Sequence, residues 1–343
     1  MKQIEFGLDT FGDVTYDENG RTLHQAQVLR NIVAEGVFAD QVGLDFFGVG
    51  EHHRDDFTVS APEIVLAGIA TLTKKIRLGS AVTVLSSDDP IRVFERFSTL
   101  DAISNGRAEV IVGRGSFIES FPLFGFDLNQ YEVLFEEKLQ LFAKLIKNTP
   151  VTWQGKTRTP LKDQDVYPKL EKAPLRTWIA VGGTPQSVRR AAHYGMPLML
   201  AIIGGEYAAF KPFVDLYKKS LKQSGFEDAP MIGVHSPGYV AATDEQAKDE
   251  CWPHYRAMVS RIGRERGWPP ITREQFELGC GSDGALFVGS PQTVAKKIIN
   301  AIKILELSRF DLKYSHGTIP HENLMKCIEL YGKEVVPLVR AGL

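Results

Sequence analysis

The sequence predicts an α/β protein with a (β/α)8 TIM-barrel fold and insertions after the fourth and seventh strands. Two observations support this prediction. Short apolar segments alternate with longer amphipathic segments along most of the 343 residues, a pattern typical of parallel strands joined by helices. Eight such units follow one another without a recognisable linker. We therefore expect one domain over 1–343, with a closed barrel favoured over an open doubly wound sheet.

The predicted strands are short and carry many β-branched residues. They span 4–8, 46–49, 76–85, 108–112, 177–181, 198–203, 231–240 and 309–313. Helical periodicity follows them over 22–42, 61–73, 90–105, 128–147, a segment ending at 193, 207–224, 244–262, 292–305 and 321–340. Pro62, Pro90 and Pro291 stand in first turns, where the missing N–H of proline costs nothing.

Two segments interrupt the alternation. Residues 151–172 are rich in proline, lysine and threonine and indicate an excursion with a hairpin. Residues 243–283 are too long for a simple connection. We expect irregular chain beyond residue 262, because Pro269-Pro270 and several glycines follow the helical pattern. This insertion is a candidate lid over the barrel mouth.

Composition narrows the class of protein. There are 40 basic and 42 acidic residues, and this near balance argues against a nucleic-acid partner. The three cysteines are widely spaced and form no CxxC pair, which favours a cytoplasmic protein without a disulfide framework. The N-terminus lacks an apolar signal-peptide region, and no apolar run is long enough to span a bilayer.

Glu51, His52 and His53 follow the second strand directly. Imidazole can act as a base, a hydrogen-bond donor or a metal ligand. Adjacent residues on an extended chain alternate in direction, so at most two of the three face one site. A metal site needs further ligands, and the other strand ends offer only scattered candidates such as Asp9 and His316. A metal-dependent hydrolase and a purely structural trio both remain alternatives, although we expect no metal.

Gly182, Gly183, Thr184 and Ser187 lie where the fifth strand gives way to a helix. Glycines let the backbone approach an anion closely, and a helix N-terminus offers unpaired N–H groups and a favourable dipole. The turn is therefore a candidate phosphate cradle. It lacks the P-loop lysine and the three-glycine dinucleotide fingerprint. A simple capped turn is the alternative.

Two further strand ends carry candidate binding residues. Arg114, flanked by glycines after the fourth strand, is suited to bidentate contact with a phosphate. An ion pair with Glu119 or Glu51 is the alternative for this arginine. The third strand contains the small and β-branched residues Ala81, Val82 and Thr83, against which a flat ring can lie; ordinary strand packing is the alternative there.

Taken together, these motifs resemble the bacterial-luciferase-like flavin monooxygenases. The matching stretches are 48–70, 76–117, 178–200 and, more weakly, 289–298, in the same order. The series EHH, GSAV, SNGR, GRG and GGTPQSV is more specific than any one of its members. The resemblance implies an enzyme that uses reduced FMN and O2 on a small organic substrate. It also implies a homodimer and, as a possible partner, a flavin reductase.

The resemblance assigns roles to the residues that match. It implies that Arg114, the turn 182–184 and Ser187 hold the FMN phosphate. It implies that Ala81-Val82 lies at the back face of the flavin, where the family often has a non-proline cis peptide bond. The catalytic histidine of the family matches His52 first and His53 second. Glu51 is expected to orient the pair or to contact the flavin, which makes all three residues candidate catalytic groups.

Departures from the family pattern bear on chemistry. Gly113 stands where some members have a reactive cysteine, so cysteine adduct chemistry is not expected. The glycine pair 182–183 replaces the acidic-plus-serine cradle of the light-emitting enzymes, so light emission is not expected. An F420-dependent dehydrogenase on the same barrel and a non-catalytic flavin-binding protein remain alternatives.

Overall fold

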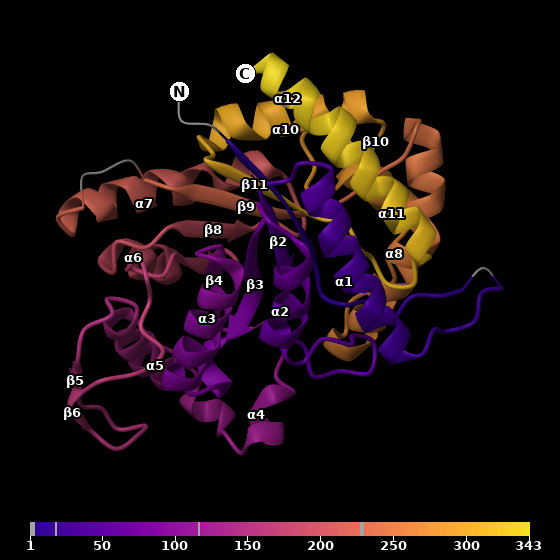
Figure 1. Ribbon diagram of the computed structural model, residues 1–343. Helices are drawn as coiled ribbons and strands as arrows, with labels where there is room; N and C mark the ends of the chain where they lie inside the picture. The colour runs from indigo at the N-terminus through magenta and orange to yellow at the C-terminus, as the bar shows by residue number, and fades with distance from the viewer. Residues whose placement is uncertain (1–3, 18, 116, 227–229) are drawn as a thin grey trace.

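A computed structural model describes residues 4–17, 19–115, 117–226 and 230–343 and confirms the predicted TIM barrel (Figure 1). Eight parallel strands pair in the order β9-β11-β1-β2-β3-β4-β7-β8, and β8 pairs with β9 to close the barrel. The strands are β1 (Glu5–Thr10), β2 (Phe46–Val49), β3 (Arg77–Val84), β4 (Ala108–Gly113), β7 (Thr177–Val181), β8 (Leu198–Ala201), β9 (Ile232–Val240) and β11 (Arg309–Lys313). All eight coincide with predicted strands.

Helices surround the barrel on its outside (Figure 1). The main ones are α1 (Gln25–Gln41), α2 (Pro62–Leu72), α3 (Pro90–Ser104), α5 (Tyr131–Leu145), α6 (Pro185–His193), α7 (Lys211–Gln223), α10 (Pro291–Leu305), α11 (His321–Leu330) and α12 (Val336–Gly342). A π turn, Tyr331–Val335, joins the last two, and 3-10 turns span Leu85–Ser87, Leu128–Gln130 and Tyr207–Phe210. The predicted first-turn prolines are confirmed: Pro62, Pro90 and Pro291 begin α2, α3 and α10. The side chains of Asp89 and Ser290 cap the last two helices.

Both predicted insertions are present. Residues 151–172 contain the antiparallel hairpin β5 (Val151–Trp153) and β6 (Leu161–Gln164), and the short helix α4 (Ser120–Phe124) lies before them, outside the predicted bounds. Residues 243–283 contain α8 (Asp244–Arg266) and α9 (Arg273–Cys280), and they are followed by the unpredicted strand β10 (Phe287–Gly289), which pairs with the end of β9. The expectation of irregular chain beyond residue 262 was wrong, because Thr272 and Gln275 form a capping box that starts α9.

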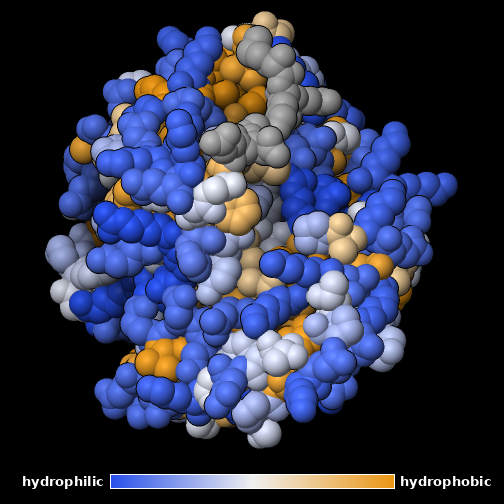
Figure 2. All heavy atoms as spheres, turned by 90° about the vertical axis from the view of Figure 1, so that its left-hand side faces the viewer, coloured by the Kyte–Doolittle hydropathy of each residue, from blue (hydrophilic) through white to orange (hydrophobic). Residues whose placement is uncertain are grey.

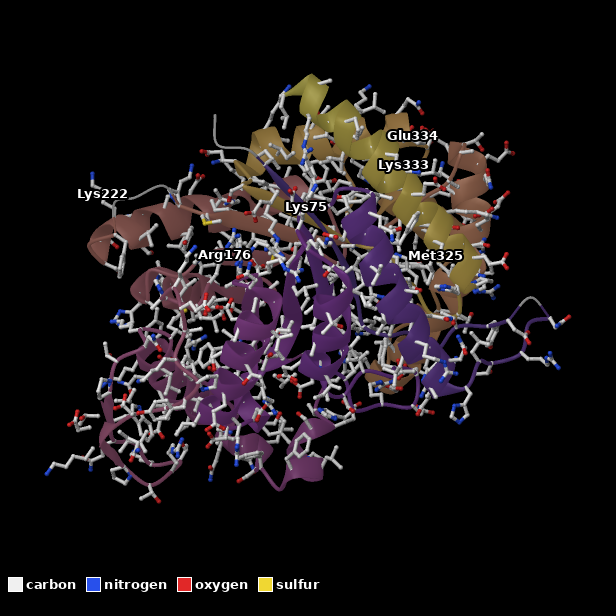
Figure 3. The ribbon with its side chains drawn as sticks, viewed as in Figure 1. Lys75, Arg176, Lys222, Met325, Lys333 and Glu334 are labelled. Carbon is white, nitrogen blue, oxygen red and sulfur yellow. The ribbon has the colours of Figure 1, made fainter. Side chains whose placement is uncertain are left out.

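A buried ionic network lies at the amino ends of the barrel strands. Arg309 is fully buried; its Nε lies 2.8 Å from both carboxylate oxygens of Asp311, and its Nη1 pairs with Glu109. The guanidinium also lies 3.4 Å from the ring centre of Phe46. Burial alone would raise the pKa of Glu109, but Arg309 and Arg176 (labelled in Figure 3) outweigh it and lower that pKa to about 2.

The apolar cores lie inside and outside the barrel wall. A small inner cluster consists of Phe46, Ala81, Ile111, Trp178 and Met199. The larger cluster fills the space between strands and helices. The face shown in Figure 2 is mainly hydrophilic, with scattered apolar patches. Within the described ranges, no helix has the length and apolar character needed to cross a membrane.

We expect Arg309→Met to lower the free energy of unfolding by about 3–5 kcal/mol, because it leaves the buried carboxylate of Asp311 without its partner and removes one of the cations that face Glu109. Urea unfolding followed by circular dichroism measures the change. The control is Lys333→Met on the outer C-terminal helices (Figure 3), where the lysine forms an exposed pair with Glu329. Lys333→Met should lower the free energy of unfolding by less than about 1 kcal/mol. Equal losses in both variants would contradict a structural role for the network.

Candidate active site

A cavity of about 350 Å³ opens at the carboxyl ends of the barrel strands. Eight of the residues predicted for the site line it: Glu51, His52, His53, Ala81, Val82, Arg114, Gly182 and Ser187. They follow the ends of β2, β3, β4 and β7, and the parallel pairing of these four neighbouring strands brings together residues that lie far apart in the sequence. Gly183, Thr184 and Thr83 are not among the lining residues.

Glu51 connects His53 to the end of β3. Its Oε1 lies 2.9 Å from Nε2 of His53, and its Oε2 accepts a hydrogen bond of 2.8 Å from the backbone N–H of Val84. The carboxylate is buried, so both of its oxygens are used within the protein. Glu51 therefore orients His53 rather than the pair of histidines.

His52 lies among aromatic rings. Its imidazole stacks on Phe57 with a centroid separation of 4.4 Å and lies 4.7 Å from Phe11 and 5.3 Å from Phe117. Neither ring nitrogen has a hydrogen-bond partner in the part of the chain that the structure describes. Burial lowers the pKa of His52 to about 3. The ring is therefore neutral near physiological pH, and His52 is one of the residues that line the cavity.

Arg114 and Ser187 meet at one edge of the cavity. Arg114 Nη2 donates to Ser187 Oγ at 3.4 Å, although the two residues belong to different strand ends. Its Nη1 pairs with Glu132 on α5, not with either predicted alternative, Glu119 or Glu51. The Glu132 side chain is 62% exposed. A bound anion can therefore displace this carboxylate without leaving it buried and unpaired.

The glycine turn lies beside this arginine at the N-terminus of α6. A Cβ atom at Gly182 or Gly183 would meet no other atom within 4 Å, so there is open space against the backbone. Gly183 has a φ of 126°, which only glycine adopts readily. Thr184 Oγ1 donates to Ser187 Oγ at 2.8 Å. Open backbone, hydroxyl groups, a guanidinium and a helix N-terminus together fit a phosphate.

The strand β3, next to β4 in the sheet, contributes another part of the cavity wall. The peptide bond between Ala81 and Val82 is cis, as the resemblance implies, and both residues line the cavity. Thr83 is fully buried in the strand, and its hydroxyl donates to Ser80 Oγ at 2.8 Å. Ala81 and Val82 therefore form a flat apolar surface, whereas the Thr83 side chain belongs to the barrel wall.

Two further cavity residues were not predicted as a pair. His235 Nδ1 lies 2.7 Å from Oδ2 of Asp9, and both side chains line the cavity. Asp9 was considered only as a scattered metal ligand, and His235 was not considered. A single histidine inside an apolar strand is equally typical of a core position, so the sequence contains no clear signal for this contact.

Arg54 ties three segments together at the cavity mouth. Its guanidinium pairs with Asp56 at 2.9 Å, with Glu119 at 2.7 Å and with Glu265 near the end of α8 at 2.7 Å. It also lies 4.5 Å from the ring centre of Phe117. The second insertion is thus attached to the loop that carries the histidines.

A sequence profile of the luciferase-like monooxygenase family matches residues 10–305. The chain therefore belongs to this family. The alkanal monooxygenase alpha chain of Photorhabdus luminescens is 27% identical over 254 residues, which cover 70% of this chain and 67% of that protein. Among the described residues, no group of three or more His, Cys, Asp or Glu side chains is arranged to hold a metal ion.

Solved structures share the fold. The oxygenating constituent of 3,6-diketocamphane monooxygenase from Pseudomonas putida, a type II Baeyer-Villiger enzyme in complex with FMN, has a TM-score of 0.77 at 20% identity and covers 98% of both chains. The coenzyme F420-dependent tetrahydromethanopterin reductase of Methanopyrus kandleri has a TM-score of 0.74 at 18% identity, covering 98% of this chain and 99% of that one.

We expect the ring of His52 to stay neutral between about pH 5 and 8. Its ring-proton NMR signal, assigned by its loss in His52→Gln, should show no titration over this range. Unfolded chains bind a proton at this histidine below its ordinary pKa of 6.5, whereas the folded protein does so only near 3. The stability that depends on neutral His52 is therefore lost as the pH falls from 6.5 towards 3. A titration midpoint near 6.5 would contradict the burial of this ring.

Proposed function

We propose that this protein is a cytoplasmic FMN-dependent monooxygenase, which uses reduced FMN and O2 to oxygenate a small organic substrate. The main observation behind this proposal is the contact between Arg114 and Ser187 at one edge of the cavity. His52 and His53 line the same cavity. Membership of the luciferase-like monooxygenase family supports the same reaction class.

Bound reduced FMN supplies the electrons and the reactivity towards O2. Arg114, Ser187 and the backbone N–H groups at the start of α6 bind its phosphate. With FMN bound, Arg114 would pair with the phosphate in place of Glu132, whose side chain is already 62% exposed. Thr184 orients the hydroxyl of Ser187 through their 2.8 Å hydrogen bond.

The cavity wall positions the ring and keeps water out. Ala81 and Val82 offer the ring a surface without polar side chains. Phe11 and Phe117 also line the cavity and exclude water from the reacting atoms. His52, neutral and without a protein partner among the described residues, supplies or takes one proton at the reaction centre. Glu51 holds His53 beside it.

The proposal includes three further elements. The insertion 243–283 acts as a lid, supported by the ion pair between Arg54 and Glu265 at the cavity mouth. Two copies of the chain associate as a homodimer. A separate flavin reductase is the source of reduced FMN.

We expect Arg114→Ala to weaken FMN binding by about 2–3 kcal/mol, because a charge-assisted contact with the phosphate is lost. Fluorescence titration with FMN measures the affinity. Glu132→Gln should bind FMN more tightly than the wild type, since it removes the competing carboxylate. Arg92→Ala, which removes an exposed pair with Glu95 on α3, is the control and should bind normally.

The same titration with F420 separates the two cofactor classes. If the protein binds F420 tightly and does not bind FMN, and if it turns over substrate without consuming O2, the protein is an F420-dependent dehydrogenase and the proposed monooxygenase function is wrong. An unchanged affinity of Arg114→Ala for FMN would show that Arg114 does not bind the FMN phosphate.

We expect His52→Gln to lower turnover at least about a hundredfold while FMN affinity changes less than about threefold, because the imidazole acts on protons at the reaction centre and not on the phosphate. Oxygen uptake with reduced FMN and a panel of small organic substrates measures turnover. Wild-type turnover in this variant, with FMN bound normally, would exclude His52 from catalysis.

A further inference from the structure

The carboxylate of Asp9 and the imidazole of His235 form a pair in the cavity that no step of the proposed reaction uses. Asp9, at the end of β1, is fully buried. Its Oδ2 lies 2.7 Å from His235 Nδ1, and its Oδ1 has no hydrogen-bond partner among the described residues. His235 is therefore the one hydrogen-bond partner of this buried carboxylate among the described residues.

The geometry leaves one nitrogen of His235 available. A carboxylate can only accept, so Nδ1 carries the proton and donates it to Asp9. Nε2 is then an acceptor, and it has no partner in the part of the chain that the structure describes. Asp9 is also held in place: a Cβ atom at Gly48 would lie 2.0 Å from its Oδ1, so only glycine at 48 leaves room for this carboxylate. Such a carboxylate–imidazole pair is the arrangement of a general base.

Phe11 lies between this pair and His52. Its ring is nearly parallel to that of His235, at 5.8 Å, and lies 4.7 Å from the ring of His52. The two imidazoles therefore contact one phenyl ring and face the same cavity. Lys313 also approaches Phe11, at 4.7 Å, but it is buried and paired with Asp13 at 3.0 Å. It is therefore not available to a ligand.

The charge of the lining restricts what binds beside His235. The acidic lining residues are Asp9, Glu51 and Glu119, and Arg114 is the only cationic one among those that the structure describes. Arg114 is committed to the edge that holds Ser187. A substrate that carries a permanent negative charge would find no unpaired cation among the described lining residues beside His235, so a neutral molecule with an O–H donor is favoured.

We propose that the Asp9–His235 pair binds and deprotonates a weakly acidic hydroxyl group, a phenol or an enol, on an otherwise apolar substrate. The O–H bond breaks, the proton joins His235 Nε2, and the electron pair stays on the oxygen. Asp9 stabilises the resulting imidazolium. No oxidant takes part in this step. The inference names the substrate class of the proposed monooxygenase and rests on that function, since an oxyanion makes the substrate more electron-rich for oxygenation.

The probe is 4-nitrophenol, whose anion absorbs at a longer wavelength than the neutral phenol. The full-length protein is titrated with it in a buffer below the pKa of the free phenol. The wild type should convert the bound probe to its anion. His235→Gln should bind the probe roughly tenfold to a hundredfold more weakly and leave it neutral. Asp9→Asn should also leave it neutral, because an amide does not stabilise imidazolium.

Two variants serve as controls. His193→Gln, which alters an exposed histidine on α6, should behave as the wild type. His52→Gln should still ionise the probe; loss of the anion there, with retention in His235→Gln, would overturn the assignment. FMN titration of every variant reports on folding. A wild type that binds FMN and leaves the probe neutral overturns this inference alone, whereas one that ionises the probe and binds no FMN overturns the proposed function alone.

Discussion

The closed ladder of parallel strands is the constraint on which the site depends. Because every strand runs in the same direction, all eight carboxyl ends lie on one rim. β11 pairs with β9 on one side and with β1 on the other, so residues 9 and 235, which are 226 positions apart in sequence, come within hydrogen-bonding distance. An open sheet of the same strands would leave the outer strands too far apart to share one cavity.

The polar groups that line the cavity lie in different local environments, which give them different chemical properties. His52 is surrounded by aromatic rings and stays neutral, whereas His53, its neighbour in sequence, is held by the buried carboxylate of Glu51. Arg114 marks the edge suited to an anion. Polar groups of different character thus occupy different parts of one pocket, and the apolar surface between them keeps their hydrogen bonds away from bulk water.

Much of this arrangement could be predicted from the sequence, because strand periodicity and the order of motifs are local signals. The eight strands and the approach of Arg114 to the turn near Ser187 follow from them. Contacts between distant side chains could not be predicted. Glu132 becomes the partner of Arg114 only through the placement of a long helix, and His235 meets Asp9 only because β11 pairs with both β1 and β9. The strand β10 is three residues long, too short for its periodicity to be recognised.

The ion pairs of Arg54 affect how molecules reach the cavity. One guanidinium holds carboxylates from three different segments, so the mouth cannot widen on one side without weakening its hold on the others. Two of these carboxylates are partly exposed to solvent, and dissolved salt screens such pairs. A rise in ionic strength is therefore expected to loosen the attachment of the second insertion to the loop that carries the histidines, while the buried pairs at the other end of the barrel are screened much less.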